Sequence, residues 1–282
     1  MIYDVAIIGT GPAGLSAALN FKLHNKNIIW FGSKNLSNKV EKSEKIANYP
    51  GFGMISGREL NNIFQEQIKN ADLEITDKMV TNIVPAKDGF MLLGDNEVYN
   101  AKTILLATGT VSANPLKGEK EFLGCGVSYC ATCDGFLYKN KVIAVICGDK
   151  KYEHEAAYLA GLADKVYLMA VYKDCAVSLP NVVRVNKAIS EIKGIGRAQT
   201  IVFKDGDEFA VDGVFILRNS IAPSTLIKGI KMDGPHIMVD RNMTTSIKGI
   251  YAAGDCTGRP YQITKAVGEG NIAAHAILEY LA

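Results

Sequence analysis

Long apolar runs are missing from this 282-residue sequence. A membrane-spanning helix needs roughly 18 apolar residues in a row, whereas apolar runs here, such as residues 142–147 and 103–107, have only the length of strands. Residues 1–4 also lack the basic start and the long apolar core of a secretory signal. We therefore expect a cytoplasmic protein that does not enter a membrane.

A strong charge of one sign is missing as well. The formal net charge is +2, which is too small to indicate a nucleic-acid partner and at most favours an acidic protein partner. Hydrophobic residues make up 48% and charged residues 21% of the chain, which excludes disordered and low-complexity architectures. The length suffices for two ordinary domains. The four histidines are scattered, His154 and His236 have no evident partner, and we interpret all four as structural.

Cysteines are few, and only Cys130 and Cys133 of the six form a C-x-x-C pair. A secreted disulfide scaffold would be richer in cysteine, and a four-ligand zinc site would need a second such pair or closely spaced histidines. The pair therefore indicates redox chemistry, and we predict no metal site. Cys147 and Cys256 follow apolar runs and are expected to be buried, whereas Cys175 is expected in a loop or at the surface.

Glycine, by contrast, is abundant, with 27 residues. Residues 3–8 have the pattern of a buried parallel strand, residues 15–24 that of a helix, and residues 27–31 that of a second strand. A G-x-G-x-x-G motif stands between the first strand and the helix, so this stretch is typical of a dinucleotide-binding β-α-β unit. Its candidate cofactor-binding residues are Gly9, Gly11, Pro12, Ala13 and Gly14.

Each glycine of this motif has a physical role. Gly9 permits the tight turn, Gly11 leaves the backbone bare for a pyrophosphate, and Gly14 lets the helix pack closely on the strand. The free N–H groups at the start of the helix then face the phosphates. An NAD site usually has an acid about 20 residues further on, at the end of the second strand, but that strand ends without one. The motif alone leaves FAD and NAD both open.

A second β-α-β pattern follows in the middle of the chain. Residues 142–146 and 165–169 are expected strands, and residues 152–162 are the expected helix between them. Two nucleotide-fold-like units predict an α/β fold. Further expectations are a polar loop over 33–47, a helix over 56–70, a strand over 103–110, a linker over 111–118 and a final helix over 264–281.

Five motifs, spread over nearly the whole chain, resemble those of the low-molecular-weight thioredoxin reductase family of flavoproteins and follow one another in the family's order. The most specific of them is the C-A-T-C-D-G segment that holds Cys130 and Cys133. The full set consists of Gly9–Gly14, Asn48–Gly51, Ala107–Gly109, Gly126–Gly135 and Ala252–Asp255.

This resemblance implies two dinucleotide-binding-like (Rossmann-type) three-layer domains, the second inserted into the first. Residues 1–111 and 223–282 would form a discontinuous FAD-binding domain, and residues 112–222 an inserted redox-disulfide domain with a degenerate NADPH-type fold. It also implies a homodimer, with Asn48 and Gln262 near the flavin. The cofactor-binding candidates that it adds to the glycine motif are Asn48, Thr108, Gly109, Gly254, Asp255 and Gln262, with Asp255 on the ribityl-phosphate side.

The resemblance also assigns roles to the redox segment. Cys133 would face the flavin and receive its electrons, Cys130 would attack the disulfide of thioredoxin, and Asp134 would be the general acid that protonates the leaving thiolate. The chemistry of such a pair is thiol–disulfide exchange. A helix that starts at the motif would favour the thiolate form of one cysteine.

The middle unit departs from the family where ordinary members bind NADPH. Their second glycine motif is replaced here by the segment Cys147-Gly148-Asp149-Lys150-Lys151-Tyr152. Asp149 would repel a pyrophosphate, and Tyr152 would keep the helix and the strand apart. The arginines that hold a 2′-phosphate in the family are absent after the next strand, and only lysines remain nearby as point charges.

These changes favour a donor other than NADPH, and the sequence resembles the ferredoxin-dependent flavin thioredoxin reductases of the same family. We therefore expect reduced ferredoxin as donor and thioredoxin as substrate. Ferredoxins are typically acidic, so Lys34, Lys39, Lys42 and Lys45 of the polar loop are candidates for docking. The alternatives are an NADPH-dependent thioredoxin reductase with a divergent pocket, a flavin disulfide reductase with another donor, and a flavin-containing redox sensor.

Overall fold

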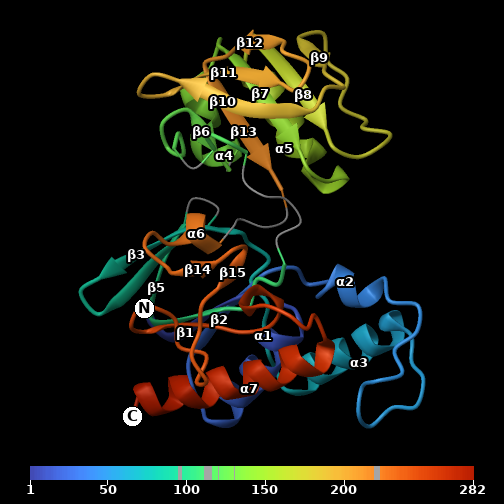
Figure 1. Ribbon diagram of the computed structural model, residues 1–282, viewed down its shortest axis with the longest axis vertical. Helices are drawn as coiled ribbons and strands as arrows, with labels where there is room; N and C mark the ends of the chain where they lie inside the picture. The colour runs from blue at the N-terminus through green and yellow to red at the C-terminus, as the bar shows by residue number, and fades with distance from the viewer. Residues whose placement is uncertain (95–96, 111–115, 120, 130, 219–222) are drawn as a thin grey trace. The chain divides into compact units, whose positions relative to one another are not determined.

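The computed structural model describes residues 1–94, 97–110, 116–119, 121–129, 131–218 and 223–282, without the side chain of Cys133. The chain folds into two compact units (Figure 1). Unit 1 comprises Met1–Ser112 and Ala222–Ala282, and unit 2 comprises Ala113–Ile221. In the sequence, unit 2 is therefore inserted into unit 1.

A six-stranded sheet forms the centre of unit 1. Its strands are β1 (Ile2–Ile8), β2 (Ile28–Phe31), β3 (Val80–Ala86), β4 (Gly89–Gly94), β5 (Glu97–Leu106) and β16 (Ile250–Ala252). The order is β2-β1-β5-β4-β3, and β16 pairs with the end of β5. β1 is parallel to both β2 and β5, with Ile7 opposite Trp30 on one side and Leu105 on the other. Its last four residues are buried and apolar, as expected for a central parallel strand.

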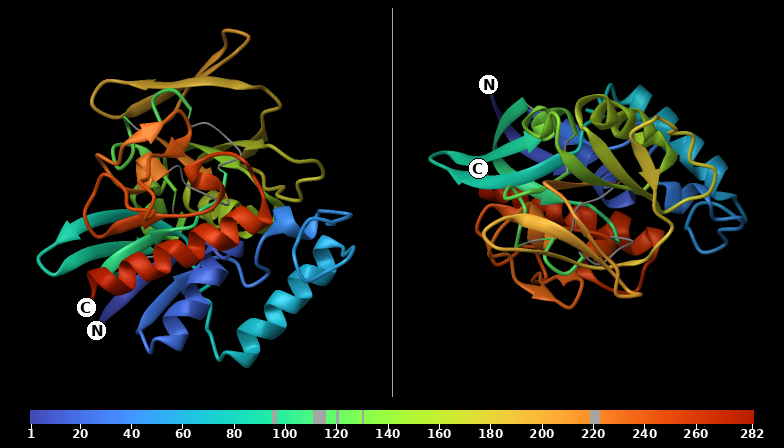
Figure 2. Two further views of the ribbon diagram at one scale, coloured as in Figure 1. Left: turned by 60° about the horizontal axis from the view of Figure 1, so that its bottom comes forward. Right: turned by 90° about the horizontal axis from the view of Figure 1, so that it is seen from above.

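Two helices of unit 1, α1 (Pro12–Leu23) and α7 (Ile263–Tyr280), lie side by side (Figures 1 and 2). Their backbones approach closely because Gly270 has no side chain, since a Cβ there would lie 2.2 Å from the carbonyl oxygen of Ala13. A third helix, α3 (Gly57–Asn70), begins with a capping box formed by Ser56 and Glu59. The remaining elements are α2 (Asn38–Glu41), α6 (Pro223–Leu226), β14 (Met232–Asp233), β15 (His236–Ile237) and η3 (Asp255–Thr257).

The main core of unit 1 joins these helices to the sheet. Phe21, Trp30, Leu60, Leu105 and Ile277 belong to it, and each is at most 1% exposed. Burial of a large apolar side chain contributes about 1.5–3 kcal/mol. The core thus binds the first and the last segments of the chain to each other.

Unit 2 contains a parallel five-stranded sheet of order β6-β13-β7-β8-β9. These strands are β6 (Val127–Ser128), β7 (Val142–Cys147), β8 (Lys165–Ala170), β9 (Val182–Arg184) and β13 (Gly213–Leu217). An antiparallel sheet is formed by β10 (Ile189–Gly194), β11 (Ala198–Phe203) and β12 (Glu208–Ala210). The helices are α4 (Ala131–Asp134), η1 (Gly135–Tyr138), η2 (Lys150–Tyr152) and α5 (Glu153–Leu162). Ile143, Val145, Leu159 and Phe215 form the centre of its core.

The predicted β-α-β units are present in both units, and the expected α/β fold class is confirmed. Helix α1 begins at Pro12, before the predicted start, because the fixed φ of proline suits the first helical turn. The strand predicted over 103–110 begins at Glu97 and ends at Leu106. The polar loop over 33–47 contains α2, which Ser37 caps. Of the predicted linker, residues 111–115 lie outside the described residues, and Gly118 packs against Ile192 within unit 2.

Candidate active site

The glycine turn between β1 and α1 is held by its neighbours in the sheet. The Gly9 N–H donates to the carbonyl of Phe31 at 2.8 Å, and the Trp30 indole donates to the Gly9 carbonyl at 2.9 Å. Gly9 has a φ of +118°, and a Cβ there would lie 2.1 Å from the Ala107 carbonyl oxygen. A Cβ on Gly14 would lie 2.0 Å from the Gly9 carbonyl oxygen. These two positions accept only glycine because of packing.

Gly11 differs from its two neighbours because a Cβ there would contact nothing within 4 Å. It is the N-cap of α1 and provides no side-chain cap, and the first turn of the helix contains no acidic residue. Pro12 and Ala13 begin the helix. Free N–H groups at a helix start with open space in front of them fit the pyrophosphate of a dinucleotide.

The ends of two parallel strands meet beside this turn. Ala252 of β16 lies opposite Leu106 of β5, so Thr108 and Gly109 on one side and Gly254 on the other emerge at the same edge of the sheet. Gly254 is close to the glycine turn, since a Cβ on it would lie 3.0 Å from the Cβ of Ala13. The fold therefore brings three separate predicted motifs to the carboxyl edge of the sheet, where open α/β folds bind ligands.

Asn48 and Gln262, which the resemblance predicts to lie near a flavin, are in contact. The Asn48 side-chain amide donates to the Gln262 Oε1 at 2.8 Å. Gln262 is the N-cap of α7, and both side chains are exposed.

Asp255 follows directly after Gly254 and forms an ion pair with Lys39. Lys39 also lies over the ring of Tyr261, with its Nζ 4.7 Å from the ring centroid. The Tyr261 hydroxyl lies 2.6 Å from the Nε2 of His236. His236 therefore has a partner that the sequence did not reveal.

Sequence reasoning missed Lys265 and Glu269, which hold the loop after β16. Lys265 Nζ donates to the carbonyls of Gly254 and Gly258 at 2.8 Å each and to the Thr257 hydroxyl at 2.9 Å. Glu269 accepts from the Gly254 N–H and from the Thr257 hydroxyl at 2.8 Å each. The i,i+4 spacing of the pair on the final helix was the available signal.

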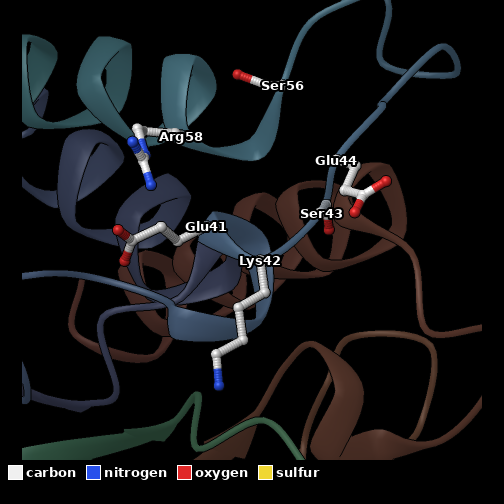
Figure 3. Close-up of a pocket in the computed structure, with 6 residues that line it drawn as sticks. All are labelled: Glu41, Lys42, Ser43, Glu44, Ser56 and Arg58. Atoms are coloured by element: carbon white, nitrogen blue, oxygen red, sulfur yellow. The ribbon is translucent and has the colours of Figure 1, made fainter.

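The polar loop is not uniformly basic. Its candidate docking residues Lys34, Lys39, Lys42 and Lys45 are all exposed. Lys42, however, lines a cavity of about 550 Å³ together with Glu41, Glu44 and Arg58, which come from α2, the segment after it and the start of α3 (Figure 3). The acids reduce the positive charge of this surface.

In unit 2, α4 begins at Ala131, so a helix starts within the C-x-x-C segment as expected. Cys130 and the side chain of Cys133 lie outside the described residues. The hydroxyl of Ser128 donates to the Asp134 Oδ2 at 2.6 Å. This bond fixes the carboxylate of the predicted general acid beside the redox segment.

The turn over residues 147–152, which stands in place of a second glycine motif, is surrounded by acidic side chains. The carboxylate of Asp149 accepts from the Lys151 N–H at 3.2 Å and caps η2. Glu153, in the first turn of α5, accepts from the Tyr172 hydroxyl and the Ala176 N–H at 3.0 Å each. The Ala176 N–H and then the Tyr172 hydroxyl lower the pKa of Glu153, so this carboxylate stays charged. A phosphate at the start of α5 would be repelled by the carboxylates of Asp149 and Glu153, and the Lys151 N–H that could bind it is already hydrogen-bonded.

The buried cysteines agree only in part with expectation. Cys147 and Cys256 are buried as predicted, at 0% and 2% exposure. Cys175 lies in a loop, one of its two predicted positions, but it is also buried, at 8%, and is not at the surface. The loop that carries Cys175 is drawn inward by Arg184, whose guanidinium donates to the carbonyls of Cys175 and Val177. Burial raises the pKa of the Cys147 thiol.

Among the described residues, no group of three or more histidine, cysteine or acidic side chains is arranged to hold a metal ion. No helix in the same part of the chain has both the length and the apolar character to cross a membrane.

Two Rossmann-type units with a C-x-x-C segment at a helix start are the arrangement of a disulfide oxidoreductase, and the comparison with known families agrees. The family model of the pyridine nucleotide-disulphide oxidoreductases matches residues 3–270. The chain belongs to this family.

Several relatives of this chain are thioredoxin reductases. The thioredoxin reductase of Mycoplasma pneumoniae is 32% identical over 302 residues, which cover 100% of this chain and 96% of that protein. The structure of a ferredoxin-flavin thioredoxin reductase from Clostridium acetobutylicum is 43% identical with a TM-score of 0.92, covering 100% of this chain and 98% of that one. A thioredoxin reductase structure from Gloeobacter violaceus is 29% identical with a TM-score of 0.79, covering 99% and 94%.

These relatives confirm the resemblance drawn from the motifs, including the likeness to the ferredoxin-flavin branch. They also confirm the two-domain Rossmann-type fold and the enzyme class, a flavin-dependent disulfide reductase of the thioredoxin reductase type.

Proposed function

We propose that this chain is an FAD-dependent thioredoxin-disulfide reductase that takes electrons from reduced ferredoxin rather than from NADPH. The observation that carries the proposal is the contrast between two helix starts. At α1, Gly11 leaves open space and no acid is present, which suits a pyrophosphate. At α5, Asp149 occupies the Lys151 N–H and Glu153 adds a second negative charge, which opposes one.

Under this proposal, unit 1 is the FAD-binding domain, unit 2 is the redox-disulfide domain, and the protein is a homodimer. The start of α1 would hold the pyrophosphate, Asp255 would lie toward the ribityl phosphate, and Asn48 and Gln262 would contact the flavin. Flavins accept single electrons and deliver them in pairs, which joins a one-electron carrier to a two-electron disulfide.

The proposed roles of Cys130 and Cys133 balance as thiol–disulfide exchange. Two electrons and two protons convert their disulfide to two thiols, with Cys133 on the flavin side. The Cys130 thiolate then attacks the disulfide of thioredoxin, and Asp134 protonates the sulfur that leaves. Cys133 next displaces the second thioredoxin sulfur and re-forms the intramolecular disulfide. The hydrogen bond from Ser128 supports this role because it holds Asp134 beside the segment.

The donor is tested by anaerobic reduction of the purified holoenzyme. Reduced ferredoxin, NADPH and NADH are added separately while flavin absorbance is followed. We expect rapid bleaching by ferredoxin alone. Rapid bleaching by NADPH at micromolar concentration would instead establish the ordinary donor and contradict the proposal.

The roles of the cysteines are tested with Cys130→Ser and a matched control. Cys130→Ser should abolish the reduction of thioredoxin and leave the reduction of the flavin by ferredoxin intact. Cys125→Ser, at an exposed cysteine five positions before Cys130, should leave both intact. Loss of flavin reduction in Cys130→Ser would refute the proposed division of roles.

A further inference from the structure

Glu119 is a carboxylate buried completely in unit 2, with 0% exposure. Three donors converge on it. The Tyr129 hydroxyl donates to Oε1 at 2.5 Å, the Leu116 N–H donates to Oε2 at 2.8 Å, and the guanidinium of Arg218 forms an ion pair with Oε1. A buried carboxylate is tolerated only when its charge is paired and its oxygens are hydrogen-bonded, as they are here.

The positions of these partners along the chain are informative. Unit 2 spans Ala113–Ile221, so the chain passes between the units only near those two residues. Leu116 is the first described residue after the first passage, and Arg218 is the last before the second. One carboxylate therefore ties together the first and the last described residues of unit 2.

The third partner leads to the redox segment. Tyr129 directly precedes Cys130 and is itself 4% exposed. The guanidinium of Arg218 lies over its ring, 5.4 Å from the centroid. β6, which leads into Tyr129, is parallel to β13, which leads into Arg218, with Ser128 opposite Phe215. Side-chain and backbone contacts thus hold Tyr129, the residue before Cys130, against β13 and Arg218.

The hydrogen bond from Tyr129 persists across the working pH range. Burial, followed by the neighbouring Glu119 carboxylate, raises the pKa of Tyr129, so its hydroxyl stays protonated and donates. A buried ion pair of this kind adds little net stability compared with apolar packing, but it specifies one geometry.

We propose that Glu119 is a positioning residue that couples the redox segment to both passages between the units and so holds the Cys130–Cys133 pair in one orientation within unit 2. The inference rests on the proposed function, in which the disulfide must meet first the flavin and then a macromolecular partner. A segment that moved independently of the passages would reach the flavin in the reactive position less often.

The test uses the holoenzyme with dithiothreitol, which needs neither ferredoxin nor thioredoxin. Dithiothreitol gives two electrons to the Cys130–Cys133 disulfide and becomes a cyclic disulfide. The new dithiol then passes the two electrons to the flavin as its own disulfide re-forms. Cleavage of the disulfide is followed by thiol labelling, and the second transfer by flavin bleaching, so that access to the cysteines and their approach to the flavin are measured separately.

The informative variant is Tyr129→Phe, which removes one hydrogen bond and keeps the ring and the ion pair. We expect flavin bleaching to slow about three- to tenfold, as loss of one hydrogen bond to a charged group would give. Thiol formation, flavin content and melting temperature should not change. The control is Tyr99→Phe in unit 1. The Tyr99 hydroxyl also donates to a carboxylate that is paired with a cation, since it lies 2.6 Å from Glu97, which forms an ion pair with Lys78. Neither thiol formation nor flavin bleaching should change in this variant.

Each of the following results would overturn the inference. Flavin bleaching at the wild-type rate in the Tyr129→Phe variant would show that the hydrogen bond from Tyr129 to Glu119 does not position the redox segment. Equal slowing of thiol formation and bleaching, or a lowered melting temperature that accounts for the slowing, would show general loosening. If the wild type forms thiols but never bleaches its flavin, the proposed relay itself fails, and the role of Glu119 fails with it.

Discussion

The side-chain amide of Asn48 donates a hydrogen bond of 2.8 Å to Oε1 of Gln262 across 214 positions of sequence. Neither residue belongs to a glycine motif, and both side chains are exposed. An exposed amide pair at a helix start contributes little to folding by itself. The bond instead fixes the position of the start of α7 relative to the segment before α3, at the place proposed for the flavin.

Replacement of Gln262 by Leu should therefore weaken flavin binding more than it weakens the fold. Loss of one hydrogen bond to the cofactor or to its support costs about 1.4 kcal/mol, or roughly tenfold in the dissociation constant. Ultrafiltration with flavin fluorescence measures this constant. The control Gln67→Leu, at an exposed position of α3, should retain wild-type affinity. Equal affinities for the two variants would exclude a role of Gln262 at the flavin.

The first and second glycines of the motif should respond differently to alanine. At Gly9 a Cβ would lie 2.1 Å from the Ala107 carbonyl oxygen at a φ of +118°, so Gly9→Ala should destabilise the protein by about 3 kcal/mol or more. At Gly11, φ is −74° and a Cβ would contact nothing. Gly11→Ala should keep the far-UV circular dichroism and the melting temperature of the cofactor-free protein. It should nevertheless be purified without flavin, and a fully loaded Gly11→Ala protein would contradict a pyrophosphate site there.

Lys265 should be important for stability, although the sequence did not single it out. Lys265→Met removes the hydrogen bonds to the carbonyls of Gly254 and Gly258 and leaves the Glu269 carboxylate without its cation. We expect a loss of about 2–3 kcal/mol in the free energy of unfolding. Urea unfolding is followed by the fluorescence of Trp30, the single tryptophan, which is buried in unit 1.

A matched control separates this network from an ordinary surface pair. Lys22→Met removes the ion pair with Asp72, in which the Nζ–Oδ2 distance is 3.5 Å and both side chains are largely exposed. Its effect should stay below about 0.5 kcal/mol. Similar losses for the two variants would show that the loop after β16 does not depend on Lys265.

The sequence predicted the parts of this fold that follow from local patterns. The buried strands are continuous apolar runs, and the glycine motif marks the turn at Gly9 and the helix after it, so these elements leave a local signal in the sequence. Side-chain contacts between distant segments leave none. The pairing of Lys39 with Asp255, and of His236 with Tyr261, depends on how loops fold back onto the sheet.

Cys175 shows why the rest could not be predicted. Its polar surroundings in sequence indicate a loop, and it does lie in one, between β8 and β9. The loop is nevertheless packed inward, because Arg184 reaches back to its carbonyls and Tyr172 reaches Glu153. Burial of a loop is decided by such tertiary bonds and not by its own composition.

Cys256 should give unit 1 a stability that depends on pH in the alkaline range. Burial raises the pKa of this thiol from its ordinary 9.0 to about 11. An unfolded chain thus loses the proton near pH 9, while the folded chain keeps it to about pH 11. Because the folded state binds more protons in this window, its stability falls as pH rises, by up to roughly 1.4 kcal/mol per pH unit.

The contribution of Cys256 is isolated by comparing variants in that window. Cys256→Ala removes the titrating thiol at a cost of about 1 kcal/mol for the lost packing, and its free energy of unfolding should fall less steeply than that of the wild type between pH 9 and about 11. Cys125→Ala, at an exposed thiol, should keep the wild-type slope. Urea unfolding at several pH values, followed by Trp30 fluorescence, measures the difference. Parallel curves for wild type and Cys256→Ala would mean that the thiol ionises in the folded state near its ordinary pKa.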